Sequence, residues 1–196
     1  MATWIWIFII LAGGLFGLKI LYVLSIALVL PITQGALYVS TSRKKIAAFI
    51  DAVPMKTDQV LVDLGCGDGR VLREARKRYG IRTIGYEINP LAYLKARLFS
   101  LGCSKIKIEH QNFWEADLSG ADVVFCYLYP DVMKKLAAKL KSGLKPGAIA
   151  VSSNFPLPEL IPSKILHPER GLHIDPMYVY RISPKNSEPK NPRGNR

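Results

Sequence analysis

Residues 60–70 read Val-Leu-Val-Asp-Leu-Gly-Cys-Gly-Asp-Gly-Arg, and the rest of the chain is organised around them. An apolar, β-branched run leads to Asp63, glycine then occupies every second position from Gly65 to Gly69, and a helical pattern follows. This order predicts a buried strand, a tight loop and the start of a helix. Glycines let the backbone approach a ligand closely, and a helix N-terminus offers free N–H groups. The stretch therefore predicts a ligand-binding loop.

Strand and helix patterns alternate on the C-terminal side of this loop. Repeated β-α units predict an α/β fold with a doubly wound, mainly parallel, Rossmann-like sheet whose ligand lies beyond the C-terminal ends of the strands. An amphipathic helix is expected just before the first strand. We expect strands at 60–64, 83–88, 105–109, 121–128, 148–152 and 177–182, and apolar helix positions at Ile46, Phe49, Ile50 and Val53, at Val71, Leu72, Ala75 and Tyr79, at Leu91, Leu94 and Leu98, and at Val132, Leu136 and Leu140.

The N-terminal segment is apolar, and Lys19 is its only charged side chain between residues 3 and 40. Residues 4–30 in a helix would measure about 40 Å, which exceeds the roughly 30 Å hydrocarbon core of a bilayer. One tilted transmembrane helix with Trp4 and Trp6 at an interface is the simplest interpretation. A helical hairpin that turns near Gly13-Gly14 or Lys19 is the alternative.

Arg43-Lys44-Lys45 follow the apolar segment, whereas no basic side chain precedes it. The positive-inside tendency then predicts a single-pass membrane protein in which everything after residue 42 faces the cytoplasm. A cleaved signal peptide is disfavoured because it would need a basic region before the apolar run. We therefore expect a membrane anchor at 1–42, a folded domain at 43–183 and a basic, disordered tail at 184–196.

Charge and cysteine usage limit the class of partner. The formal charge of +12 and a pI near 9.7 indicate an anionic neighbour, either a membrane surface or a nucleic acid, or simply a solvated basic surface. The three cysteines are Cys66, Cys103 and Cys126, and they form no CxxC pair. This pattern argues against a disulfide framework and against a metal site, and it fits a reducing compartment.

The ligand of the glycine loop can be narrowed by what is missing. A phosphate-binding loop needs Gly-Lys-Ser/Thr after the glycines, and here Arg70 follows Gly69. The dinucleotide pattern G-x-G-x-x-G also fails at Arg70. Glu87, 24 residues after Asp63, ends the next expected strand, where a carboxylate can accept hydrogen bonds from both hydroxyls of a ribose. A nucleoside without phosphates fits these features.

These residues carry a resemblance. Asp63-Leu-Gly-Cys-Gly-Asp-Gly-Arg70 resembles the first motif of class I S-adenosylmethionine-dependent methyltransferases, and Gly85-Tyr-Glu87 resembles their second. A narrower likeness, to the membrane-anchored protein-lysine methyltransferases related to the ATP synthase c-subunit enzyme, extends along the chain. In that family Ser is usual at Cys66 and Asp at Asn112. The segments that carry the narrower likeness are Tyr38-Val-Ser-Thr41, Gly85-Tyr-Glu-Ile-Asn-Pro90, Asn112-Phe-Trp114, Asn154-Phe-Pro-Leu-Pro158 and Tyr178-Val-Tyr180.

The resemblance implies S-adenosyl-L-methionine as cofactor. Asp63 would hold its ammonium group and Glu87 its ribose hydroxyls, while the glycine loop passes under the methionine and ribose. Asn112 would face the adenine amino group, with Phe113 beside the ring. The remaining implied cofactor contacts are Gly65, Cys66, Gly67 and Gly69 in the loop, and Tyr38 and Thr41 closing over the methionine end.

The acceptor side is expected at Tyr127 and Tyr129, after the fourth long strand, and at Asn154. Aromatic faces can hold a lysine ammonium before it loses its proton. The leading hypothesis is a membrane-anchored methyltransferase for lysine side chains of a membrane or membrane-proximal protein. A methyltransferase for a lipid, a quinone or another small membrane-associated substrate is the alternative. A non-catalytic cofactor-binding module or a nucleic-acid binder forms the third class.

Overall fold

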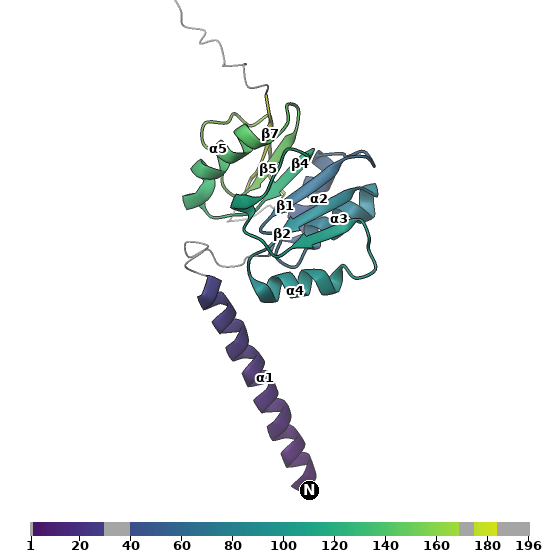
Figure 1. Ribbon diagram of the computed structural model, residues 1–196, viewed down its shortest axis with the longest axis vertical. Coiled ribbons are helices and arrows are strands. Elements are labelled where there is room, and N and C mark those ends of the chain that lie inside the picture. The colour runs from purple at the N-terminus through teal and green to yellow at the C-terminus, as the bar shows by residue number, and fades with distance from the viewer. Residues whose placement is uncertain (1, 30–39, 169–174, 184–196) are drawn as a thin grey trace, which may run out of the picture.

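The computed structural model describes residues 2–29, 40–168 and 175–183, which form an N-terminal helix and an α/β domain (Figure 1). A single seven-stranded sheet has the order β3-β2-β1-β4-β5-β7-β6. Strands β1 to β5 are parallel, and β7 is antiparallel to both of its neighbours. The predicted doubly wound, mainly parallel sheet is confirmed. Its strands are β1 (Val60–Leu64), β2 (Arg82–Tyr86), β3 (Ile106–Glu109), β4 (Val123–Cys126), β5 (Ile149–Ser153), β6 (Lys164–Leu166) and β7 (Met177–Arg181).

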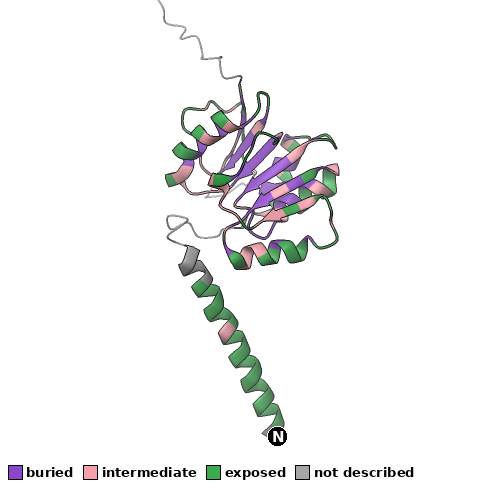
Figure 2. Cartoon of the chain, viewed as in Figure 1, coloured by how far each residue is buried: buried purple, intermediate pink, exposed green. Residues whose placement is uncertain are grey.

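Helices cover both faces of this sheet. Residues of α2 and α3, such as Phe49 and Leu72, share one apolar cluster, and Leu136 and Leu140 of α5 belong to the cluster on the other face. The strands between the two clusters are mostly buried (Figure 2). The helices are α1 (Ala2–Val29), α2 (Arg43–Ala52), α3 (Arg70–Tyr79), α4 (Pro90–Phe99) and α5 (Met133–Gly143), with short 3-10 turns at Phe113–Glu115 and Pro130–Val132.

Strand β1 occupies the centre of the sheet between β2 and β4. Asp63 lies in register with Gly85 of β2 on one side and with Phe125 of β4 on the other. The strand order reverses at this point, because the chain runs outward through β2 and β3 and then returns to β4. Ligands of such sheets bind where the order reverses, beyond the C-terminal ends of the strands. The loop after β1 therefore begins at the expected binding crevice.

Side chains cap the N-termini of two helices. The side chain of Asn89 accepts hydrogen bonds from the N–H groups of Leu91 and Ala92, and Pro90 occupies the first turn of α4. The oxygen of Ser42 accepts a bond from the N–H of Lys45 and so caps α2. Such caps satisfy N–H groups that have no partner within the helix.

The expected strand ends differ from the observed ones. Strand β2 ends at Tyr86 rather than at residue 88, and β4 occupies only Val123–Cys126 of the expected 121–128. In both places the apolar residues continue beyond the last paired residue of the strand. The predicted strands are therefore too long, because the chain leaves the sheet there and forms the binding crevice. The sequence also missed β6 (Lys164–Leu166), a three-residue edge strand with two exposed positions and no alternating pattern to reveal it.

The α1 helix runs without a break through Gly13, Gly14 and Lys19. This continuity agrees with the single-span interpretation, whereas a hairpin would need a turn near these residues. Its side chains from residue 3 to residue 24 are almost all exposed (Figure 2). By length and composition Thr3–Leu24 could cross a membrane, although a signal sequence would pass the same test. The predicted tail at 184–196 and the predicted site residue Tyr38 lie outside the described residues.

Candidate active site

The glycine loop is held against the end of β2. Gly65, Gly67 and Gly69 have φ angles of +76°, +57° and +75°, which side chains rarely tolerate. The N–H groups of Gly65 and Cys66 both donate to the carbonyl of Tyr86, each at 2.9 Å. The spacing of the three glycines thus has a conformational cause, and the loop conformation depends on β2.

Gly85 of β2 provides the space in which this loop sits. A Cβ atom at Gly85 would lie 2.6 Å from Cys66 Sγ and 2.6 Å from Leu72 Cδ1, far inside contact distance. Gly65 meets a comparable neighbour, because a Cβ there would lie 3.2 Å from Leu128 Cδ2. The Gly85-Tyr86-Glu87 motif therefore combines a packing requirement at its first position with a polar group at its last.

Glu87 lies directly after β2 and is 8% exposed. Its Oε2 atom accepts a hydrogen bond from Gly67 N–H, and Oε1 accepts one from Asn89 N–H, both at 2.8 Å. Burial raises the pKa of this carboxyl group, and the N–H donors oppose that rise. Each carboxylate oxygen has a second acceptor position, so Glu87 can still receive two hydroxyl donors from a ligand.

Asp63 is 2% exposed, and its Oδ2 atom has no hydrogen-bond partner among the described residues. Burial raises the pKa of Asp63 well above its ordinary value, and the nearby charges of Glu87 and Asp68 raise it further. A buried polar atom without a partner is destabilising, by roughly 1–3 kcal/mol. A cationic or hydrogen-bond-donating ligand group would satisfy this oxygen.

A small hollow brings predicted residues from distant parts of the chain together. Asp63, Gly65 and Cys66 line it from the sheet, Ser40 and Thr41 from the segment before α2, and Phe125 and Tyr127 from β4 and its end. The structure thus places Thr41 and Tyr127 beside the glycine loop.

The segment before α2 is fastened to the glycine loop by Arg70. Its guanidinium donates to both carboxylate oxygens of Asp68, at 2.9 and 2.8 Å, and to the Thr41 carbonyl at 3.2 Å. Burial pushes the pKa of Asp68 upward, but the hydrogen bonds and charge of Arg70 outweigh it, and the pKa is lowered. Asp68 is therefore an ionised structural group rather than a second acidic site.

A buried lysine lies close to Tyr127. Lys45 is 3% exposed, and its Nζ atom lies 2.6 Å from Asn154 Oδ1, 2.9 Å from Asp175 Oδ2 and 5.1 Å from the centre of the Tyr127 ring. Asn154 Nδ2 donates to the Tyr127 hydroxyl at 3.1 Å, and Asn154 itself has a positive φ of 71°. Tyr127 and Asn154, both predicted from the sequence, are thus connected by Lys45, which in the sequence is only part of the basic run after the apolar segment. The signal that could have found it is its spacing of four residues from buried Phe49.

The other predicted residues lie near the crevice without a described contact to its centre. Asn112 Oδ1 accepts from Trp114 N–H and caps the turn after β3, and the Phe113 ring packs 4.7 Å from the Trp114 ring. Tyr129 precedes the turn at Pro130–Val132 and does not line the small hollow. The roles given to these three residues remain predictions.

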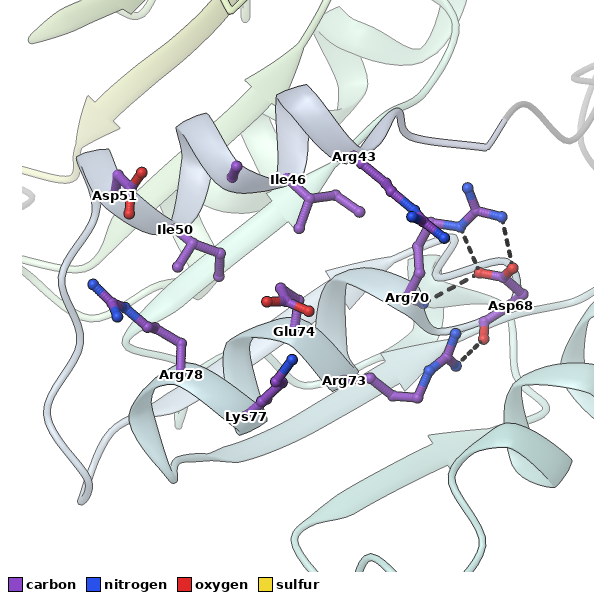
Figure 3. Close-up of a pocket in the computed structure, with 11 residues that line it drawn as sticks. Arg43, Ile46, Ile50, Asp51, Asp68, Arg70, Arg73, Glu74, Lys77 and Arg78 are labelled. Atoms are coloured by element: carbon purple, nitrogen blue, oxygen red, sulfur yellow. Dashed lines mark hydrogen bonds and ion pairs between the residues drawn. The ribbon is translucent and has the colours of Figure 1, made fainter.

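A larger groove of about 800 Å³ lies between α2 and α3 (Figure 3). Five cationic and three acidic side chains line it, and it shares only Asp68 and Arg70 with the small hollow. The groove therefore lies beside the small hollow rather than within it. Its cations are Arg43, Arg70, Arg73, Lys77 and Arg78.

Comparisons with known proteins identify the family. The profile of the ANTKMT methyltransferase domain matches residues 63–164. A protein-lysine N-methyltransferase of Saccharolobus islandicus is 32% identical over 149 residues, which cover 74% of this chain and 92% of that protein. The mouse adenine nucleotide translocase lysine N-methyltransferase is 31% identical over 78% of this chain and 66% of its own length. The human ATP synthase c-subunit lysine N-methyltransferase is 30% identical over 67% of this chain and 56% of its own length. The chain thus spans only part of these two mammalian relatives.

Solved structures agree on the fold and the cofactor. A Salinibacter ruber protein described as an RNA methyltransferase, in complex with S-adenosyl-L-homocysteine, has a TM-score of 0.70 and 30% identity and covers 78% of this chain and 98% of its own. A geranyl diphosphate methyltransferase bound to S-adenosylmethionine, at 19% identity and a TM-score of 0.51, is similar in fold alone. The chain belongs to the ANTKMT methyltransferase family and is an S-adenosylmethionine-dependent methyltransferase.

Proposed function

We propose that this enzyme methylates lysine side chains of a protein at a membrane. The relatives named as protein-lysine, adenine nucleotide translocase and ATP synthase c-subunit lysine methyltransferases support a lysine acceptor. The observation that carries the proposal is Tyr127. Its ring borders the cofactor hollow, and an ammonium group, that of Lys45, already lies 5.1 Å from the ring centre. This aromatic side chain is suited to guide a second lysine toward the cofactor.

The residues of the crevice fit the cofactor. When bound, S-adenosylmethionine supplies a methyl group on a sulfonium, which is an activated donor. Glu87 holds the two ribose hydroxyls through the acceptor positions that Gly67 and Asn89 leave. Asp63 receives the amino group of the methionine portion, which gives its unpartnered Oδ2 atom a donor. Thr41 closes over this end, and Asn112 and Phe113 receive the adenine.

The protein's own work is to orient the acceptor, exclude water and favour the neutral amine. A lysine must lose its proton before its nitrogen can attack, and burial disfavours the ammonium form. Lys45, held by its ion pair with Asp175, lies 5.1 Å from the centre of the Tyr127 ring and supports that ring. Asn154 holds the Tyr127 hydroxyl and so fixes the ring that guides the acceptor.

Residues 1–42 anchor the enzyme, residues 43–183 form the catalytic domain at the cytoplasmic face, and residues 184–196 are a basic tail. The support is the length and composition of α1, together with Arg43-Lys44-Lys45 after it. Val29 ends α1 and Ser40 lines the cofactor hollow, so the chain between them can span no more than about 40 Å. This tether keeps the crevice near the bilayer, where a membrane protein can present its lysine.

RNA is a second acceptor class with an observation in its favour. The Salinibacter ruber protein, similar over nearly its whole length, is described as an RNA methyltransferase, and the groove between α2 and α3 is cationic (Figure 3). Contacts to phosphates would make such binding fall steeply with salt. A lipid or quinone acceptor remains the other alternative, because the anchor would bring it equally close.

Methyl-labelled cofactor separates these acceptors. The full chain is incubated in native membranes with labelled S-adenosylmethionine, and a Glu87→Ala variant serves as the inactive control. We expect the label in a protein band, recovered as methyl-lysine after hydrolysis. Label that ribonuclease releases, or that extracts into organic solvent, would contradict the lysine proposal and support RNA or a lipid. A lack of binding to S-adenosylhomocysteine in calorimetry would contradict the assigned cofactor site.

A further inference from the structure

The α4 helix presents its apolar side chains to solvent. Leu94 and Leu98 are each 59% exposed, and Leu101, just past the helix, is 71% exposed. At 100° per residue these three positions fall within an arc of about 60°. Ala96, on the opposite side of the helix, is fully buried against the domain. The apolar stripe therefore points away from the protein, although the same pattern in sequence is typical of a helix that faces the core.

Cations flank this stripe, and acids are absent from it. Lys95 and Arg97 lie on its two sides, and no acidic residue occurs between Glu87 and Glu109. Arg97 Nη1 lies 3.2 Å from the Tyr93 hydroxyl, and the Lys95 Nζ atom lies 5.7 Å from the centre of the Phe99 ring. Cationic side chains beside an apolar stripe and aromatic rings are characteristic of helices that lie in the interface of an anionic membrane.

The surroundings of α4 favour the same partner. The helix lies at the end of the domain that is nearer α1, and the two helices contact each other (Figure 1). The guanidinium carbon of Arg73, which also lines the groove between α2 and α3, lies 5.3 Å from the centre of the Phe99 ring. Cationic side chains thus extend from the stripe to the groove through Arg73, so headgroup phosphates around the stripe would meet positive charge.

We propose that α4 is an interfacial helix that docks the catalytic domain on an anionic lipid bilayer, with Leu94, Leu98 and Leu101 inserted among the lipids. The proposal rests on the membrane location proposed above but concerns a separate surface. It adds an orientation to the tether. Because Asn89, the cap of α4, bonds to Glu87, docking sets the cofactor crevice beside the membrane surface.

Spin labels on the full chain test this surface. The protein is reconstituted in vesicles of phosphatidylcholine and phosphatidylglycerol at about 3:1. Cys103 is replaced by serine, Cys66 and Cys126 are buried, and one nitroxide is attached at Leu98→Cys. Lys141→Cys, an exposed position on α5, is the matched control, since α5 lies away from α4 (Figure 1). We expect the label at 98 to lose collisions with a water-soluble nickel chelate and to gain collisions with oxygen, relative to the label at 141.

Other outcomes overturn the proposal. Nickel access at 98 equal to that at 141 would place α4 in water. A label at 98 shielded from both nickel and oxygen would indicate a protein contact, either a second copy or another segment of this chain. A third label at Ile10→Cys reports the anchor separately, so a water-exposed α1 with a lipid-exposed α4 would refute the anchor and keep the docking surface. Unchanged calorimetric binding of S-adenosylhomocysteine confirms that each labelled protein is folded.

Discussion

At the scale of single residues, Glu87 shows why a carboxylate follows β2. Both of its oxygens accept a hydrogen bond from a backbone N–H, that of Gly67 and that of Asn89. Neither oxygen can therefore be replaced by a hydrogen-bond donor. Glu87→Gln would turn its amide NH₂ toward one of these N–H groups. We expect a loss of about 1–3 kcal/mol in the free energy of unfolding, because a buried donor loses its acceptor, and a weaker affinity for S-adenosylhomocysteine by at least about tenfold. Chemical denaturation and calorimetry measure the two effects.

A matched change separates this role from general damage. Glu109→Gln alters a partly exposed carboxylate at the end of the neighbouring strand and should leave cofactor affinity unchanged. If Glu87→Gln bound the cofactor as tightly as the unmodified enzyme, the assignment of the ribose site to Glu87 would be wrong.

We expect Asp63 to lower the stability of the ligand-free enzyme while it strengthens cofactor binding. Burial raises the pKa of Asp63, so the folded enzyme binds the Asp63 proton more tightly than the unfolded chain does. The resulting stabilisation of the ligand-free enzyme is fully present below the ordinary aspartate pKa. It is lost as the pH rises through the higher pKa of the folded state. Asp63→Asn removes this charge. We expect the variant to be more stable than the unmodified enzyme by about 1 kcal/mol or more at neutral pH without cofactor, and to bind S-adenosylhomocysteine more weakly.

The pH dependence of binding provides an independent check on Asp63. The affinity of the unmodified enzyme for S-adenosylhomocysteine should increase from pH 4 toward neutral pH, because only the ionised carboxylate attracts the ligand's ammonium group. The Asn variant should show a flatter profile. Equal profiles for the two proteins would show that Asp63 does not receive the ammonium group.

Residues of the site differ in how far the sequence could predict them. Asp63 and the three loop glycines form one contiguous motif, and Glu87 ends a second short motif after the next strand; in both motifs the chemical and backbone requirements coincide. Lys45 and Leu128 were missed because their roles arise from packing between segments far apart in the chain, such as α2 against the end of β5. An isolated lysine or leucine carries no motif that reports such a contact.

At the scale of elements, Lys45 joins α2 to the end of β5. Lys45→Met would keep the apolar stem but remove the donor to Asn154 and the ion pair with Asp175. We expect a modest loss of stability, about 1 kcal/mol, because the buried charge leaves together with its bonds. We expect a larger fall in kcat than in cofactor affinity, since the Tyr127 ring loses a fixed neighbour.

Lys44→Met is the matched control for this prediction, because Lys44 is exposed on the same helix. It should change neither kcat nor stability. A Lys45→Met enzyme with unchanged kcat would show that the contact between α2 and β5 does not position the acceptor side.

The elements themselves were predicted well wherever burial and period agree. The expected apolar positions of α2, α3 and α5 are largely buried. The expectation fails at α4, where Leu94 and Leu98 have helical spacing but face outward, since spacing identifies one face of a helix and not what covers it. The ends of β2 and β4 were extended too far because apolar character continues into the binding crevice.

At the scale of the whole molecule, charged side chains are distributed unevenly over the described part of a chain whose full sequence carries a formal charge of +12. Cations gather in the groove between α2 and α3 (Figure 3) and beside the apolar stripe of α4. The total charge of the sequence predicts an anionic neighbour, but where the cations gather can be seen only in the folded structure. Arg73 of α3 and Lys95 of α4, for example, approach the same Phe99 ring from different helices. This distribution leads to a prediction about where the enzyme acts.

Two lysines placed in α1 should separate the role of the anchor from that of catalysis. In the variant Ile10→Lys/Leu15→Lys, each charge near mid-span disfavours insertion by about 3 kcal/mol. The activity on an acceptor in the same membrane should fall by about a hundredfold, because the tether supplies a high effective concentration of enzyme. Methylation of a soluble peptide that carries the same acceptor lysine should not change, since the crevice begins beyond the tether at Ser40.

The variant Ile10→Leu/Leu15→Ile preserves the apolar helix and should behave as the unmodified enzyme on both substrates. Equal losses on the two substrates would indicate damage to the catalytic domain, and no loss on either would show that α1 does not bring the enzyme to its acceptor.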